Sequence, residues 1–245
     1  MRVTGVDGCK RGWVAVSLEV PGVAAGRFGP VRADPVRVHE SLAGVLDSLA
    51  GALDEGQGGQ GGQGGAAGVV GIDMPLGLLE SGWREADREA RGLLGPRRSS
   101  VFSIPPRPVW SQASYQAANQ HCRELTGQGF SIQAWGLRAK LLEADRYRLT
   151  CRHPLYEVHP ELAFGAMAGT PLVHSKHTAA GRDLRRELLS RADIVVPLVP
   201  RAPVTDTLDA AAVAWSAWRI ATGQAVVIPG CPQRDGQGRE IAIRY

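Results

Sequence analysis

Two aspartates end short apolar runs in the first third of the chain. Asp7 ends the run formed by residues 2–7, and Asp73 ends the run formed by residues 69–73. Each run has the length of a buried strand, so each carboxylate stands where a strand gives way to a loop. Two such carboxylates on neighbouring strands can share a divalent cation, because a rigid sheet holds them while they still reach solvent. The pair predicts a metal site at one edge of a sheet.

Three more acids follow in similar positions. Glu157 lies in the strand-like run 154–159, and Asp206 and Asp209 lie at the start of an amphipathic helix expected at 205–223. An unpaired carboxylate in a buried strand is costly, which favours a paired or functional role for Glu157. Three strands that carry acids and one helix that begins with acids point to a single site.

Each acid also has a purely structural explanation. Asp7-Gly8 is a dipeptide typical of hairpin turns. Asp73 stands before Met74-Pro75, where it can be the polar end of a strand that the proline turns. Asp206 and Asp209 can cap the helix and favour its dipole whatever the function. Only the joint placement of the acids favours a site over these alternatives.

The expected elements alternate between strands and helices. Strands are expected at 2–7, 13–20, 31–38, 69–73 and 154–159, with short ones at 226–228 and 241–245; helices are expected at 41–53, capped by Ser41, at 83–94, 114–149, from 160 onward and at 205–223. The Gly/Gln-rich stretch 55–68 is too poor in apolar residues to order itself, so we expect a flexible loop there. Residues 80–150, broken by the proline-rich turn 104–108, form a helical insertion.

Composition limits the class of protein. The 245 residues, with 44% hydrophobic and 21% charged content, suit one elaborated α/β domain covering 1–245. No apolar run approaches the roughly 20 residues of a membrane span. The start of the chain lacks the pattern of a signal peptide, so we expect a cytoplasmic protein. The four cysteines form no C-x-x-C pair, which argues against a zinc site or a disulfide framework.

Basic residues are grouped in two places. One group extends from Arg84 to Arg98 and a second includes Arg182, Arg185 and Arg186. Acids partly balance both groups, which favours solvated helix faces over phosphate-binding surfaces. The unbalanced stretch Arg97-Arg98-Ser99-Ser100 is the exception. The formal charge of +4 gives only a weak field toward polyanions.

Six short motifs together resemble one family, and they cover nearly the whole chain. They are Gly5-Val6-Asp7-Gly8-Cys9-Lys10-Arg11-Gly12-Trp13, Ile72-Asp73-Met74-Pro75-Leu76-Gly77, Arg97-Arg98-Ser99-Ser100-Val101-Phe102, Glu157-Val158-His159-Pro160-Glu161, Ser175-Lys176-His177-Thr178 and Asp209-Ala210-Ala211-Ala212-Val213-Ala214-Trp215. In this order they resemble the domain-of-unknown-function family 429, often described as predicted nucleases. The resemblance implies a ribonuclease H-like fold, an α/β mixed five-stranded sheet flanked by helices, with the helical insertion after the fourth strand.

The resemblance also implies an acidic set and a chemistry. Carried over by motif, the catalytic carboxylates are Asp7, Asp73, Glu157 and Asp209. Holliday-junction resolvases of the same superfamily carry two aspartates three residues apart on the last helix, which makes Asp206 a fifth candidate. Carboxylates that converge in one cleft repel each other unless cations lie between them, so Mg²⁺ or Mn²⁺ is expected, with a two-metal site suspected. The predicted function is a metal-dependent nuclease or related phosphodiester hydrolase.

Four basic residues are candidates to contact substrate phosphates, namely Arg97, Arg98, Lys176 and His177. Nucleic acid is the expected partner, and no membrane role is expected. The substrate stays open between DNA, RNA, a hybrid, a branched junction and a small phosphoester, because metal chemistry does not encode which surface surrounds it. Oligomeric state is not predicted.

Two rival functions share this fold. A non-catalytic module would bind nucleic acid or protein without cleaving it. An ATP-dependent phosphotransferase of the actin-like class also begins with a strand that ends in aspartate and glycine, but such enzymes pair two domains where this chain has room for one. The chain contains no G-x-x-x-x-G-K-[ST] sequence that would offer another nucleotide site.

Overall fold

A computed structural model describes residues 1–20, 32–33, 36–54, 68–150, 154–197, 199–200 and 202–245. The loop expected at 55–68 lies outside the described residues except for Gly68, and part of the strand expected at 31–38 lies outside them as well. Among the described residues, no helix combines the length and the hydropathy that crossing a membrane requires.

The strands are β1 (Arg2–Cys9), β2 (Gly12–Glu19), β3 (Arg32–Ala33), β4 (Arg37–His39), β5 (Val69–Asp73), β6 (Leu155–Glu157), β7 (Val227–Arg234) and β8 (Glu240–Arg244). The helices are α1 (Leu42–Asp54), α2 (Glu85–Leu94), α3 (Tyr115–Thr126), α4 (Ile132–Gly136), α5 (Arg138–Thr150), α6 (Pro160–Ala168), α7 (Ala179–Arg191) and α8 (Val204–Ala221), with 3₁₀ helices η2 (Gly95–Ser100) and η3 (Arg107–Ser111).

The main sheet has the strand order β3-β2-β1-β5-β6. β1 and β2 are antiparallel, whereas β5 lies parallel to β1 and β6 lies parallel to β5. β3 and β4 both pair with β2, so together they take one position at that edge and the mixed sheet has five strand positions. This is the α/β, ribonuclease H-like arrangement that the sequence predicts, and α2 to α5 form the insertion after the fourth position.

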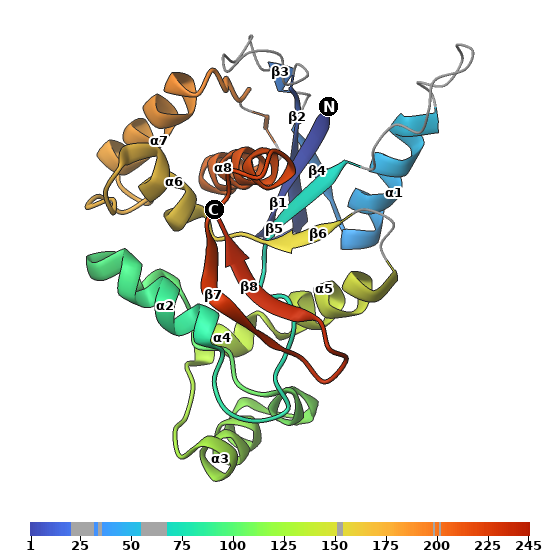
Figure 1. Cartoon of the computed structure of the whole chain (residues 1–245), viewed down its shortest axis with the longest axis vertical. Coiled ribbons are helices and arrows are strands. Elements are labelled where there is room, and N and C mark those ends of the chain that lie inside the picture. The colour runs from blue at the N-terminus through green and yellow to red at the C-terminus, as the bar shows by residue number, and fades with distance from the viewer. Residues whose placement is uncertain (21–31, 34–35, 55–67, 151–153, 198, 201) are drawn as a thin grey trace.

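Helices cover both faces of the sheet (Figure 1). One face packs against α6, α7 and α8 through an apolar cluster that includes Val14, Val16 and Ala211. The other face packs against α1 and α5 around Val6, Trp13 and other buried residues. The central strands are therefore buried on both sides, which is why they are apolar almost throughout.

Most predicted elements are present, with instructive differences at their ends. Ser41 caps α1 as expected, since the Gly44 N–H donates to its hydroxyl at 3.1 Å. The helical stretch expected at 114–149 is divided into three helices, because α3 ends at Gly127, whose φ of 74° is the left-handed conformation of a helix stop. The short strands expected near the C-terminus form a separate antiparallel pair, β7 and β8.

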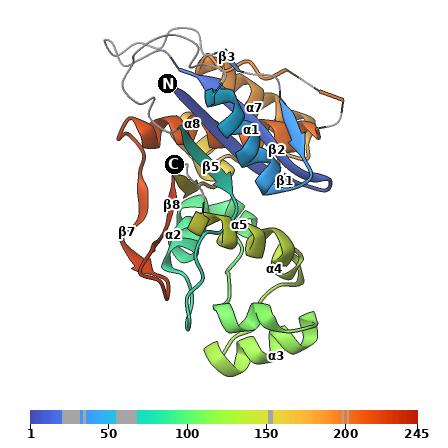
Figure 2. The ribbon, with the colours of Figure 1, turned by 90° about the vertical axis from the view of Figure 1, so that its right-hand side faces the viewer.

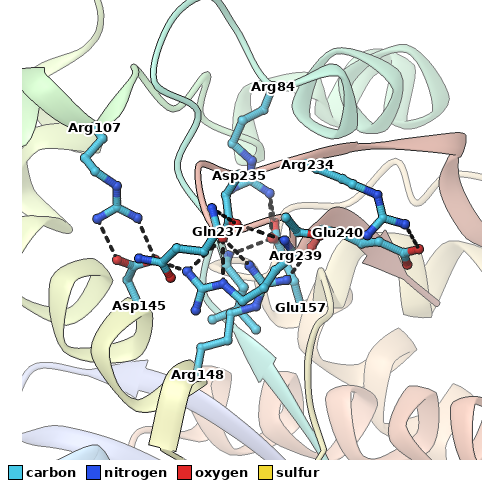
Figure 3. Close-up of polar contacts among 12 residues, drawn as sticks. Arg84, Arg107, Asp145, Arg148, Glu157, Arg234, Asp235, Gln237, Arg239 and Glu240 are labelled. Atoms are coloured by element: carbon cyan, nitrogen blue, oxygen red, sulfur yellow. Dashed lines mark hydrogen bonds and ion pairs between the residues drawn. The ribbon is translucent and has the colours of Figure 1, made fainter.

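The insertion extends away from the sheet, with α3 farthest from it (Figure 2). A polar network fastens its base to the C-terminal hairpin (Figure 3). Arg107 donates to Asp145 of α5 at 2.9 Å, and Arg148 of α5 pairs with Asp235 at 3.4 Å. Arg239 pairs with Asp235 at 2.7 Å. The insertion and the hairpin are thus held to each other as well as to the sheet.

The last helix touches the central strand without side chains between them. An ideal Cβ on Gly5 would lie 2.1 Å from both the Ala210 carbonyl oxygen and the Ala214 nitrogen of α8. A Cβ on Gly71 of β5 would meet the Val213 side chain at 2.9 Å and its carbonyl oxygen at 3.0 Å. Only glycine permits this approach, so these two residues set the distance between α8 and the sheet.

We expect Gly5→Ala to destabilise the protein by about 3 kcal/mol or more, because the added methyl group must push α8 off the sheet. The measurement is the free energy of unfolding in urea. Gly92→Ala is the control: an added Cβ on this helical residue meets nothing within 4 Å, and alanine should stabilise the helix by about 0.5–1 kcal/mol. A Gly5→Ala protein as stable as the wild type would contradict the packing described.

Candidate functional site

Asp7 and Asp73 lie side by side on the two central parallel strands, Asp73 at the end of β5 and Asp7 two residues before the end of β1. They are Cα partners in the register of β1 with β5, so the sheet itself places one carboxylate beside the other. Asp7 is only 6% exposed. The turn of the β1–β2 hairpin falls two residues later, since Cys9 pairs with Gly12, so Asp7-Gly8 is paired strand and the turn explanation is wrong.

Helix α8 supplies the next two acids. Asp209 is 2% exposed, and both it and Asp206 line the same cavity as Asp7 and Asp73. The helix begins at Val204 with Pro203 at its N-cap, and no side chain caps it. Asp206 lies in the first turn, where its charge suits the dipole, but Asp209 lies beyond it. Capping therefore does not explain the pair.

Burial and mutual repulsion perturb three aspartates, the buried Asp7 and Asp209 and the partly buried Asp73. Burial raises the pKa of Asp7 well above its ordinary value, and the charges of Asp73 and Asp209 raise it further. Burial raises the pKa of Asp73 to about 6, although Lys176 and a hydrogen bond with Asp7 act in the opposite direction. Burial likewise raises the pKa of Asp209 to about 6 against the effect of Lys176. The cluster has more negative charge than its surroundings compensate.

Lys176 is the principal counter-charge. Its Nζ lies 2.5 Å from Oδ2 of Asp209. The attraction of Asp209, Asp7 and Asp73 outweighs burial and raises the pKa of Lys176. The sequence predicts Lys176 as a substrate contact, and the structure brings it directly onto an acid of the cluster.

Glu157 is engaged elsewhere. Arg84 Nη2 donates to its two oxygens at 2.6 and 2.5 Å, and the Leu76 N–H donates to Oε2 at 2.7 Å (Figure 3). Burial raises the pKa of Glu157, and Arg84 opposes that rise. Glu157 lines the cavity, but both of its oxygens are already bonded. Through Leu76 and Arg84 it connects the loop after β5 with the start of α2.

Two buried arginines correct the interpretation of the basic groups as solvated faces. Arg84 and Arg185 are each 1% exposed. Arg185 Nη2 donates to the Glu161 oxygens at 2.7 and 2.8 Å, just as Arg84 donates to Glu157. A guanidinium can be buried when a carboxylate is buried with it. The sequence alone does not reveal that each arginine has a carboxylate partner on another element of the fold.

The other predicted phosphate contacts take different positions. Arg97 lines the cavity, with Nη2 3.7 Å from Glu161 Oε1, and His177 is exposed at the same cavity. Arg98 is exposed and is not among the residues that line the cavity. Three of the four candidates therefore gather around the acids.

The sequence interpretation missed Lys140 of α5. Its Nζ lies 5.5 Å from the centre of the Trp13 ring, and its Cδ lies 3.0 Å from where a Cβ on Gly8 would stand. It lines the cavity and forms no ion pair with a described residue. The sequence contains one indication that Lys140 has a special role, because it is one of only three lysines in a chain rich in arginine.

The acids and cations surround one cavity of about 450 Å³. Its walls are the ends of β1 and β5, the start of α8, the loop before α7, and residues of the insertion such as Phe102 and Leu137. A volume of this size is typical of sites that hold a small molecule or part of a larger one. The insertion therefore contributes directly to the site.

The acids of the cavity have the donor atoms of a divalent-metal site. Among the described residues, no three His, Cys, Asp or Glu side chains are already arranged as a metal-binding group. Asp7, Asp73 and Asp209 nevertheless offer the carboxylate oxygens that Mg²⁺ and Mn²⁺ prefer. Burial and mutual repulsion raise the pKa values of these carboxylates, and a cation bound there would relieve that repulsion. The residues fit a divalent cation.

Comparisons with known proteins give one family. Residues 5–234 match the family described as "Protein of unknown function (DUF429)". The chain belongs to this family. No curated protein matches it. The solved structure of Thermus thermophilus RuvC is similar, with a TM-score of 0.38 and 13% sequence identity over 91% of this chain and 98% of that chain.

The acid cluster should make the metal-free protein less stable as pH rises. The folded-state pKa of Asp73 is about 6 against an ordinary 3.8, so between these values the folded chain holds more protons than the unfolded one and its stability falls with increasing pH. We expect Asp7→Asn to reduce this fall and to raise the Tm at about pH 7.5 by roughly 2–4 °C, the effect of about 1 kcal/mol in a domain of this size.

The measurement is thermal unfolding in chelator from about pH 4.5 to about pH 7.5. The exposed carboxylate of Asp183, on the surface of α7, provides the control, since Asp183→Asn should leave the pH dependence unchanged. An Asp7→Asn protein less stable than the wild type at the upper end of the range would show that the carboxylates do not repel one another.

Proposed function

We propose that this protein is a metal-dependent phosphodiesterase acting on nucleic acid, with Asp7, Asp73 and Asp209 as its metal-binding carboxylates. The observation that carries the proposal is the convergence of the buried Asp7 and Asp209 and the partly buried Asp73 on one cavity that basic side chains also line. Burying repelling carboxylates destabilises a fold, and a structural role alone gives no reason to keep them together.

The residues have separate tasks in this proposal. Asp7, with Asp73 beside it and Asp209 facing both, holds Mg²⁺ or Mn²⁺, which when bound would activate water and neutralise charge on the phosphate. Asp206 lies at the same cavity and orients water near the ion. We assign Glu157 a positioning task, because Arg84 and the Leu76 N–H occupy its oxygens. Lys140, Arg97 and His177 contact phosphates of the substrate.

The proposal predicts Mn²⁺-dependent cleavage of at least one nucleic acid in a panel of single-stranded, duplex, hybrid and branched DNA and RNA. Asp7→Asn, Asp73→Asn and Asp209→Asn should each lower kcat/KM by about 10³-fold, since each removes several kcal/mol of transition-state stabilisation. Asp183→Asn removes an exposed carboxylate and should leave the rate unchanged.

The same panel separates the alternatives. Tight binding of nucleic acid without cleavage by the wild type would favour the non-catalytic module. ATP binding with phosphate transfer would favour the phosphotransferase. Cleavage that survives in Asp7→Asn would place the chemistry elsewhere in the chain or in a contaminating nuclease.

Lys140 offers a test of substrate binding that leaves the acids intact. The face of Trp13 and the space left by Gly8 hold its ammonium group at the cavity without an acidic partner among the described residues. We expect Lys140→Met to raise KM about 10-fold, with kcat little changed, because one phosphate contact contributes roughly a kcal/mol or more. Lys10, exposed in the β1–β2 turn, is the control, and Lys10→Met should leave KM unchanged. Equal KM values in the two variants would remove Lys140 from the substrate site.

A further inference from the structure

The loop that carries Lys176 is fixed by close backbone packing. An ideal Cβ on Gly181 would lie 1.9 Å from the Ser175 carbonyl oxygen, so the first turn of α7 rests directly on this loop. Thr178 caps α7 by accepting from the Gly181 N–H at 3.1 Å, and its hydroxyl donates to the Ser175 carbonyl at 2.8 Å. Lys176 therefore lies between Ser175 and Thr178, and both of these residues contact the first turn of α7 or cap it.

A buried ion pair holds the same loop from the other side. Arg185 Nη1 donates to the His174 carbonyl at 3.2 Å and to the Gly181 carbonyl at 2.8 Å, while Nη2 binds the carboxylate of Glu161. Glu161 lies in the first turn of α6. The backbone on which Lys176 stands is therefore joined to two helices, and its position is built into the fold.

The lysine ammonium divides the acidic cluster into two parts. Asp209 is bound to Lys176 Nζ at 2.5 Å, whereas Asp7 and Asp73, partners in the strand register, have no cation in direct contact among the described residues. Lys176 offsets one of the three charges of Asp7, Asp73 and Asp209, and a single divalent ion would balance the other two. Asp206 also lines the cavity and adds a further negative charge. A second ion would need the position that the ammonium holds.

The choice of residue is consistent with this arrangement. The chain has 28 basic residues of which only three are lysines, and two of those, Lys140 and Lys176, line this cavity. An ammonium is a compact point charge that can stand close to a carboxylate in the way a metal ion does, whereas a guanidinium is broad and planar.

We propose that Lys176 takes the place of a second metal ion, so that this site binds one divalent cation, held by Asp7, Asp73 and the Asp209 oxygen that does not bind Lys176, and remains mononuclear. The inference rests on the proposed function, since it specifies how the same carboxylates bind metal. It replaces the expected two-metal arrangement with one ion and one fixed ammonium, and it makes Lys176 a positioning residue that binds Asp209.

The experiment is a calorimetric titration of Mn²⁺ into metal-free protein, followed by electron paramagnetic resonance of the loaded sample. We expect one Mn²⁺ per wild-type chain and a mononuclear spectrum. Lys176→Met, which keeps the length of the side chain and removes its charge, should bind two ions and give the spectrum of a coupled pair, because ions roughly 4 Å apart interact magnetically. Lys10→Met should behave as the wild type.

The outcomes separate the two proposals. Two ions in the wild type would contradict the inference and leave the proposed function standing. A Lys176→Met protein that still binds a single ion would also contradict it. No Mn²⁺ binding by the wild type would contradict the proposed function and, with it, this inference. The wild-type stoichiometry decides the question even if the variant does not fold.

Discussion

The site depends on the direct contact between the backbone of β1 and that of α8. Gly5 brings the backbone of β1 against the backbone of α8, and Gly71 of β5 leaves room for Val213 of the same helix. Asp209 therefore comes within range of two carboxylates that the strand register has already placed together. A larger residue at position 5 would move the helix outward and separate its acids from the sheet. The positions of the acids at the end of the sheet therefore depend on how α8 packs against the middle of it.

Two buried pairs of the same kind build the walls around the acids. Glu157 and Glu161 lie four residues apart at the junction of β6 and α6. Glu157 binds Arg84, the N-cap residue of α2, and Glu161 binds Arg185 of α7. Buried ion pairs add little net stability, but they fix which groups meet, because leaving either partner alone is costly. One pair positions the insertion and the other positions the loop that carries Lys176.

The insertion and the sheet share the cavity. The sheet and α8 supply the negative charge, while the insertion and the loop before α7 supply Lys140, Arg97, Lys176 and His177. In this arrangement the acids are held by the rigid central elements, and the cations that would meet a substrate, Lys140, Arg97 and His177, come from the segments around them. A difference in the insertion could therefore alter the accepted substrate without disturbing the carboxylates.

The sequence by itself determined the order of elements and four of the aspartates that line the cavity. Apolar runs that end in Asp7 and Asp73 specify buried strands whose carboxyl ends meet at one edge, and an apolar helical pattern after Asp206 and Asp209 specifies a helix that packs on them. The periodicity of apolar residues indicates which face of a strand or helix is buried, so the strands, the last helix and the positions of their acids can be predicted from the sequence.

Only the tertiary structure decided the partners. The sequence predicts Glu157 as a fourth catalytic acid, and the structure adds that Arg84 binds its oxygens. The sequence also predicts that Arg185 lies on a solvated face, whereas Arg185 is buried against Glu161. Lys176 lies against Asp209, 33 residues away in the chain. Whether a charge is free or compensated depends on which groups the packing of separate elements brings close to it. A local sequence pattern contains no information about the distance between such groups.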